Sequence, residues 1–316
     1  MKPAASVLYS DSLLLLTAAI WGFAFVAQRV GMDAMGPFAF NAVRYAVGAL
    51  VLLPLIRHRR RNVLRFSPAT AAAASGANAS VPAAAGLRRL LPFALAGGAM
   101  FIGASLQQLG IVTTTAGNAA FVTSLYVVII PLIGSFFGRR TSLKDYIAAL
   151  IAVAGLYIIT VGFGSGFSVA PGDLFVLVGS FFWALHIIVI GRFASSVDPV
   201  ELSAGQFAVC GILSLAAALV LEPHPFQGTL TAAIPILYGG VFSCGVAFTL
   251  QIVAQRHAPP AHASIILAME GLFGAIGGVI LLSETASMRL FAGGALMLGA
   301  AILSQVSIGA KNRREL

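Results

Sequence analysis

The two halves of this chain repeat one another. Residues 11–56 align with residues 173–218 at a constant offset of 162, and residues 106–159 align with residues 250–303 at a constant offset of 144. Each half carries five long apolar segments. Because five is an odd number, a second copy of such a membrane-spanning unit enters the membrane from the opposite side, so the halves are expected to be inverted. Inverted repeats are typical of secondary transporters.

Composition supports a membrane protein. The chain is 59% hydrophobic and 9% charged, whereas soluble domains carry about 25% charged residues. Helices are the expected spanning form, because backbone polar groups in lipid need partners within their own segment. We therefore predict an all-α membrane protein with ten transmembrane helices arranged as two inverted five-helix repeats. The predicted spans are residues 12–31, 38–56, 90–111, 115–137, 145–163, 173–192, 202–221, 232–254, 262–282 and 289–308.

The basic residues set the expected orientation. Of the 19 lysines and arginines, 16 lie in the termini and in alternate links between spans. The positive-inside rule places those links, and with them both termini, in the cytoplasm. Membrane topology therefore accounts for the net charge of +9, and no nucleic-acid partner is expected.

These boundaries divide the chain into four parts. Residues 1–56 and 90–163 form the first five-helix repeat, and residues 164–310 form the second. Residues 57–89 are expected to be a flexible cytoplasmic linker, because their middle is mostly alanine with serine, glycine and proline. Residues 311–316 form a cytoplasmic tail.

Prolines and glycines punctuate the predicted helices. Pro131 lies within the fourth span and is predicted to kink it, because the proline ring removes one helix hydrogen bond. Its aligned mate, Ala275, lies in a glycine-rich stretch of the ninth span, so both helices are expected to be weakened at one depth. Small residues such as Gly155 and Gly299 also line the fifth and tenth spans. They indicate either packing within one chain or a subunit interface, so a monomer and a homodimer both stay open.

Charged side chains inside a membrane are costly, which makes each of them a candidate for function. Arg44 lies in the second span and Glu270 in the ninth. The repeat aligns Arg44 with Gln206, Gln107 with Gln251, and Tyr126 with Glu270. Such pairing of polar positions predicts a shared polar interior between the halves. The candidate residues of a substrate cavity are Trp21, Arg44, Gln107, Tyr126, Trp183, His186, Gln251 and Glu270, with the two tryptophans as apolar walls.

A structural interpretation of the same residues stays open. Arg44 and Glu270 have similar predicted depths and can form an ion pair that only holds the bundle together. His186 and the two tryptophans can be ordinary packed side chains. Glu270 is also the best candidate for a proton-linked or cation-binding group, although a uniporter would need no such group.

Motifs of enzymes and metal sites are missing from the sequence. There is no GxSxG elbow, HExxH, P-loop or CxxC motif. Cys210 and Cys244 lack the spacing of metal ligands. We therefore expect no enzymatic activity, no cofactor and no bound metal.

Several short motifs make the chain similar to the EamA type of the drug/metabolite transporter superfamily. They are Trp21-Gly22, Pro37 followed by Arg44, the run Thr113–Thr115 with Ala116 and Ala119–Ala120, Pro131, and Glu270 with Glu284. The resemblance covers nearly the whole chain except residues 57–89. It implies a multi-pass carrier of the bacterial inner membrane that moves small metabolites through a central cavity by alternating access. The chain departs from the family pattern at Arg140, where the family often has Glu, and at Gly271, where it often has Pro.

These observations predict a secondary transporter for small organic metabolites. Amino acids or related compounds are the favoured substrates, and efflux is the favoured direction. The expected partners are a small-molecule substrate and the lipid bilayer. A flippase or exporter of lipids or drugs is the alternative, and a channel is a weaker one, since channels tend to oligomerise around a pore with rings of like residues.

Overall fold

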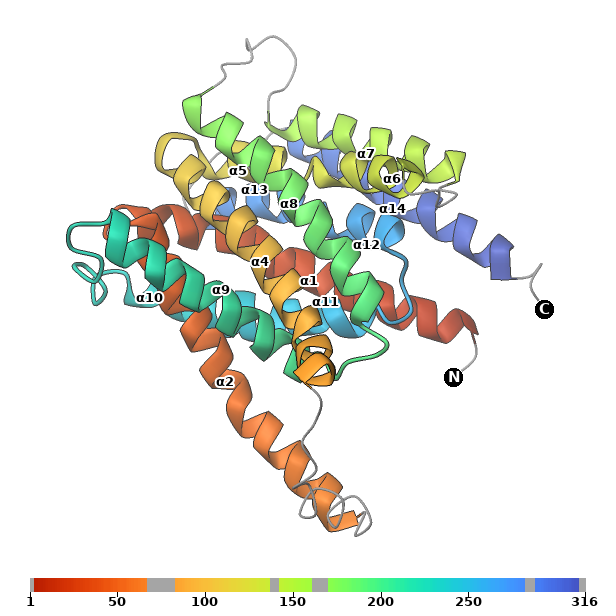
Figure 1. Cartoon of the computed structure of the whole chain (residues 1–316). Coiled ribbons are helices and arrows are strands. Elements are labelled where there is room, and N and C mark those ends of the chain that lie inside the picture. Colours follow the sequence, from red (N-terminus) through yellow and green to blue (C-terminus); the bar gives the residue numbers. More distant parts are fainter. Residues whose placement is uncertain (1–2, 67–82, 137–141, 161–169, 282–287, 313–316) are drawn as a thin grey trace.

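The computed structural model describes residues 3–66, 83–136, 142–160, 170–281 and 288–312. Within these residues every regular element is a helix and no strand occurs, which confirms the predicted all-α class. Figure 1 shows the helices packed into one bundle, with both termini at the same end. We call this the terminal end of the bundle and the opposite one the distal end.

The helices follow the predicted spans. The first half contains α1 (Pro3–Met32), α2 (Pro37–Phe66), α4 (Ala83–Thr113), α5 (Ala116–Thr123), α6 (Tyr126–Phe136) and α7 (Leu143–Thr160). The second half contains α8 (Pro171–Phe193), α9 (Pro199–Leu221), α10 (Ala233–Leu237), the π-helix η1 (Tyr238–Phe248), α11 (Thr249–Ala254), α12 (Pro260–Leu267), α13 (Glu270–Leu281) and α14 (Met288–Asn312). Among the described residues, eight helical stretches are long and apolar enough to cross a membrane, and α14 holds a shorter one, Met288–Ser304. The remaining predicted span is α7.

Two helices that the repeat makes equivalent are broken at the same point. The fourth span divides into α5 and α6 around Ser124 and Leu125, and the ninth divides into α12 and α13 at the aligned pair Ala268 and Met269. Both helices are therefore interrupted at aligned positions, seven residues before Pro131 and Ala275. Pro131 itself lies inside α6, so the interruption of the fourth span is a different feature from the kink predicted at this proline.

The eighth span differs from the expected single helix. Its centre, η1, is a π-helix of 11 residues. π-Helical turns are wider than α-helical turns and are frequent at functional sites. Backbone oxygens of η1 accept hydrogen bonds from α1: the Trp21 indole donates to the Ser243 carbonyl at 3.3 Å, and the Thr17 hydroxyl donates to the Ala247 carbonyl at 3.2 Å. These contacts join the first half to the second.

Both ends of the predicted linker, residues 57–89, are helical, because α2 continues to Phe66 and α4 begins at Ala83. Figure 1 shows the end of α2 projecting beyond the bundle. The middle of the predicted linker, 67–82, lies outside the described residues. So does most of the predicted tail, because α14 extends to Asn312.

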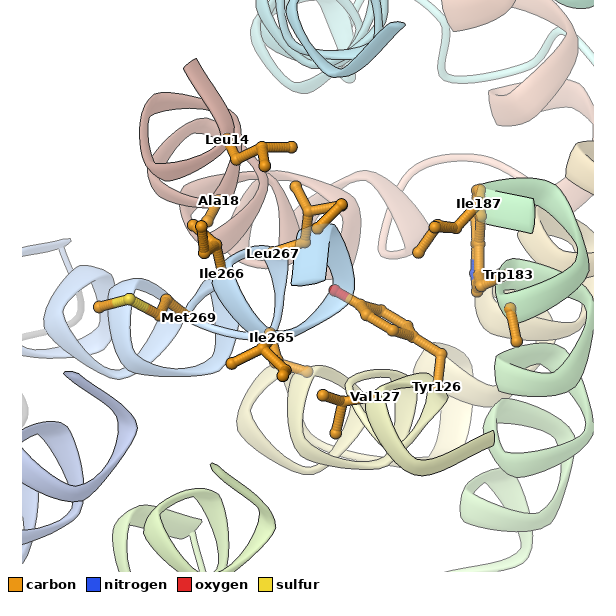
Figure 2. Packing of buried hydrophobic residues seen from close by; sticks show 14 of the residues in the cluster. Leu14, Ala18, Tyr126, Val127, Trp183, Ile187, Ile265, Ile266, Leu267 and Met269 are labelled. Carbon is orange, nitrogen blue, oxygen red and sulfur yellow. The ribbon is translucent and has the colours of Figure 1, made fainter. Parts of the chain in front are cut away.

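A hydrophobic core runs across both halves. In Figure 2, Leu14 and Ala18 of α1 lie against Ile266 of α12, and Tyr126 of α6 lies between α12 and Trp183 of α8. All five side chains are buried. The core therefore fixes α1, α6, α8 and α12 relative to one another, and three of them, α1, α6 and α8, also contribute side chains to the polar centre of the bundle.

The small residues of the fifth and tenth spans differ in how they pack. A Cβ atom added to Gly155 of α7 would lie only 2.7 Å from the carbonyl oxygen of Gly293 and 2.8 Å from Cγ of Met297, both on α14. Gly299, the aligned mate of Gly155, has no neighbouring atom within 4 Å of the same built position. Of the two expected explanations, internal packing accounts for Gly155.

This asymmetry gives a stability prediction. We expect Gly155→Leu to lower the unfolding free energy by about 1–3 kcal/mol, because the larger side chain forces α7 and α14 apart. Gly299→Leu is the matched control and is expected to be close to neutral. Thermal unfolding of both variants in detergent measures the difference. Equal unfolding temperatures for the two variants would contradict the packing argument.

Candidate functional site

A small cavity lies between the two halves of the bundle. Its volume is about 40 Å³. Its lining comes from α1, α2, α4, α5 and α6 of the first half and from α8, η1 and α13 of the second. The lining residues are Trp21, Ala24, Phe25, Gln28, Arg44, Tyr45, Gln107, Thr123, Tyr126, Trp183, His186, Ile187, Ser243, Phe248 and Glu270. Seven of the eight predicted cavity residues are therefore brought together.

Arg44 is a buried cation without a buried anion beside it. Its side chain is 3% exposed. One guanidinium nitrogen donates to the Tyr45 hydroxyl at 3.1 Å, and the guanidinium carbon lies 4.7 Å and 5.7 Å from the ring centres of Tyr45 and Phe40. Among the described residues no carboxylate pairs with it, and its Nε atom has no hydrogen-bond partner. A charge in this position is costly unless a partner satisfies it.

Glu270 faces the same cavity as the first residue of α13, directly after the helix break. It is 3% exposed. Its carboxylate accepts hydrogen bonds from the Tyr126 hydroxyl at 2.9 Å and from the Ser124 hydroxyl at 3.3 Å. The aligned residues Tyr126 and Glu270 thus meet across the two halves. No Arg44–Glu270 ion pair forms within the described part of the chain, so the purely structural pairing of these two charges is not observed.

Aromatic rings form one wall of the cavity. Phe248, at the end of η1, has its ring centre 4.6 Å from that of Trp21 and 6.0 Å from that of Trp183. The Trp183 indole donates to the Gln107 side-chain oxygen at 2.9 Å, and the Gln107 amide donates to Gln28 at 3.0 Å. The polar ends of both tryptophans are therefore tied down, which leaves their ring faces as a fixed apolar surface.

His186 and Gln251 differ in their relation to the cavity. His186 lines it, and its Nε2 atom lies 2.9 Å from the Gln206 side-chain oxygen. Gln251 does not line it: its amide turns along its own helix and donates to Gln255 at 3.0 Å. The prediction for Gln251 is therefore wrong, because the aligned polar positions do not all face one interior.

Several lining residues escaped the sequence analysis. Gln28 is an amide side chain three residues before the end of the first predicted span at position 31, and a polar residue inside an apolar span was the available signal for it. Phe248 gave no signal, since its aligned mate is Ala104 and apolar residues fill this span.

A larger cavity opens toward the distal end. It measures about 830 Å³ and is lined by the ends of α1, α4 and α7, by the start of α5 and by one side of α13. We call it the distal vestibule. Its polar lining includes Arg29, Thr113, Thr114, Thr115 and Asn118. Neither cavity contains a metal site: no group of three histidine, cysteine or acidic side chains suited to a metal ion is found where side chains are described.

A family model and several known proteins match this chain. The model of the EamA-like transporter family matches residues 8–161 and 170–305. An uncharacterized transporter of Archaeoglobus fulgidus is 30% identical over 95% of this chain and 87% of its own length. The uncharacterized inner membrane transporter YedA of Escherichia coli K12 is 23% identical over 85% of this chain and 81% of its own length. One solved crystal structure has a TM-score of 0.70 at 18% identity, over 96% of this chain and 97% of the other, and it shows a shared fold.

Two copies of an apolar helical unit with a polar cavity between them are typical of membrane transporters. This chain belongs to the EamA-like transporter family, and it is a multi-pass membrane transporter of small molecules. The two matched ranges correspond to the two repeats found in the sequence.

Proposed function

We propose that this protein is a secondary transporter that exports small organic metabolites, with amino acids or related zwitterions as its substrates, by alternating access. One observation carries the proposal. A buried guanidinium and a buried carboxylate, from Arg44 and Glu270, line one cavity between the halves without pairing to each other. A zwitterion offers a carboxylate for the first and an ammonium group for the second.

The aromatic wall supports the same substrate class. The faces of Trp21, Trp183 and Phe248 form an apolar surface beside the two charged groups. Such a surface accepts an apolar or aromatic side chain, and tryptophan faces also attract cations. The cavity would therefore bind both ends and the side chain of one small molecule.

The size of the cavity supports alternating access. At about 40 Å³, the central cavity has about a twentieth of the volume of the distal vestibule, so the centre is far more constricted than the approach to it. Substrate binding therefore requires the halves to move apart, and the distal vestibule of about 830 Å³ supplies the approach from one end. Carriers with inverted repeats rock one repeat against the other around a site at their interface.

The distribution of charge supports an orientation. Exposed Arg57, Arg59, Arg61 and Arg256 lie at the terminal end. By the positive-inside rule we place that end, and both termini, in the cytoplasm. The membrane is the bacterial inner membrane, as it is for YedA. Activity of a phosphatase fused to the C-terminus, which requires an extracytoplasmic location, would overturn this orientation.

Counterflow in proteoliposomes tests the function. Liposomes preloaded with one unlabelled amino acid are expected to accumulate the radiolabelled compound, and empty liposomes are not. The panel should contain neutral, acidic and aromatic amino acids, cationic dyes and a fluorescent phospholipid. Movement of the phospholipid alone would favour a flippase, and ionic current without counterflow would favour a channel. Either result would overturn the proposal.

A further inference from the structure

A second polar cluster lies outside the central cavity, at the terminal end of the bundle. His262, near the start of α12, has its Nε2 atom 2.7 Å from the Asp11 carboxylate of α1 and its Nδ1 atom 2.9 Å from the Ser304 hydroxyl of α14. The histidine is 2% exposed and the serine is fully buried. Asp11 comes from the first half and the other two residues come from the second. We call these three residues the terminal cluster.

The repeat places a matching set of polar residues at the distal end. Asp11 aligns with Asp173 at the offset of 162, and His262 aligns with Asn118 at the offset of 144. Ser304 aligns with Thr160, another hydroxyl residue, at the same offset of 144. Asp173 and Asn118 again come from different halves. We call Asp173 and Asn118 the distal pair.

The distal pair is not assembled in this structure. Asp173 is 4% exposed and accepts hydrogen bonds from the Thr114 hydroxyl at 2.5 Å and from the Ala170 amide at 2.8 Å. Asn118 instead lines the distal vestibule, half-buried. The same aligned positions are thus joined at one end of the bundle and separated at the end where the large cavity opens.

We propose that the terminal cluster and the distal pair are the two gates of the transporter, and that only one of them is assembled at a time. In this conformation His262 and Asp11 hold the terminal end closed while the distal end is open. In the opposite conformation Asp173 and Asn118 meet and the terminal cluster separates. The proposal deepens the proposed alternating-access function and rests on it.

Symmetry provides the physical argument. In a carrier built from two copies of one unit, each copy can adopt the conformation that its mate holds now, and that exchange reverses the open end. Hydrogen bonds to charged groups are stronger than those between neutral groups, so each assembled gate stabilises the state in which it forms. Removing one gate must therefore shift the population toward the state that lacks it.

Thiol labelling of single cysteines tests the gates. The native Cys210 and Cys244 are fully buried and are first replaced by alanine. One reporter is Ala258→Cys, placed at a buried position of the terminal end between α11 and α12. The other is Ala275→Cys of α13, which lines the distal vestibule. A membrane-impermeant maleimide is applied from each side of the membrane in turn.

The two gate variants are expected to act in opposite directions. Asp11→Asn should raise labelling at position 258 and lower it at position 275, with a shift of about tenfold in the equilibrium between the two states. Asn118→Ala should raise or preserve labelling at position 275 and leave position 258 protected. Arg59→Gln, which removes an exposed ion pair with Asp198 outside both gates, is the matched control and should move neither reporter.

The possible outcomes distinguish failure of the gate assignment from failure of the proposed function. His262→Gln offers a second way to open the terminal cluster and should reproduce the effect of Asp11→Asn. If both variants leave position 258 protected, or if Asp11→Asn and Asn118→Ala move the reporters in the same direction, the gate assignment is wrong. Such a result rejects the gate assignment even if the parent protein shows counterflow. Absence of counterflow for every substrate would instead reject the proposed function.

Discussion

Arg44→Gln is expected to reduce counterflow of carboxylate-bearing substrates by roughly 10- to 100-fold. A hydrogen bond to a charged group contributes about 1.5–3 kcal/mol, and every 1.4 kcal/mol is a factor of about ten in affinity. Arg44 is buried and, within the described residues, has no carboxylate partner, so a substrate carboxylate is the anion best placed to satisfy it. Initial rates at low substrate concentration measure the loss.

Two further variants make this test specific. Arg44→Lys keeps the positive charge but loses the planar fork that binds a carboxylate at two points, so it should retain only part of the rate. Arg192→Gln removes an exposed arginine of α8 that stacks on Phe193, outside the cavity, and should transport normally. Equal losses for substrates with and without a carboxylate would show that Arg44 only maintains the fold.

Glu270→Gln is expected to abolish uptake driven by an imposed pH gradient while exchange of substrate continues. The carboxylate is the only acidic side chain that lines the cavity among the described residues, and it lies at the helix break between the halves. Glutamine keeps the size of the side chain and can still accept hydrogen bonds from Tyr126 and Ser124, but it cannot bind and release a proton. Uptake with and without a pH gradient, measured beside counterflow, separates the two effects.

Tyr126→Phe is the matched control for this variant. It removes the 2.9 Å hydrogen bond to Glu270 and leaves the carboxylate in place, so pH-driven uptake should persist at a changed rate. If Glu270→Gln responds to the pH gradient as the parent protein does, the carboxylate binds substrate alone and the coupling assignment is removed.

Much of the fold could be predicted because hydrophobic length and repetition determine it directly. A span needs about 20 apolar residues, and each half of the sequence contains five such segments. A common weak point in the fourth and ninth spans was also expected. The interruption lies seven residues before Pro131, at Ser124 and Leu125, and the proline itself lies inside α6, so proline chemistry did not reveal where the fourth span divides.

The π-helix explains why Gln251 was misplaced. Gln107 lies on α4, an uninterrupted helix, whereas Gln251 follows the 11 residues of η1. Because a π-helix has more residues in each turn, it changes the direction in which the following side chains point. Gln251 consequently faces Gln255 rather than the cavity. Nothing in the residue types of η1 distinguishes it from an ordinary apolar helix.

Buried aromatic residues of the site are a second group that the sequence alone could not identify. Phe248 packs between the two tryptophans, but the chain contains 22 phenylalanines and most of its spans carry several. Only tertiary structure selects Phe25 and Phe248, the two that reach the cavity. The charged and amide residues were easier to find, because each is unusual inside a membrane.

The contact between Tyr126 and Glu270 depends on the two units being joined in a single polypeptide. Two identical five-helix chains inserted in opposite orientations about a two-fold axis would present the same residue from both sides, so a carboxylate would face another carboxylate and a phenol another phenol. In a single polypeptide the two sides can differ, and here one side carries an acid while the other supplies the hydroxyl that holds it. A single carboxylate can thus stand at the centre of the molecule without a like charge opposing it.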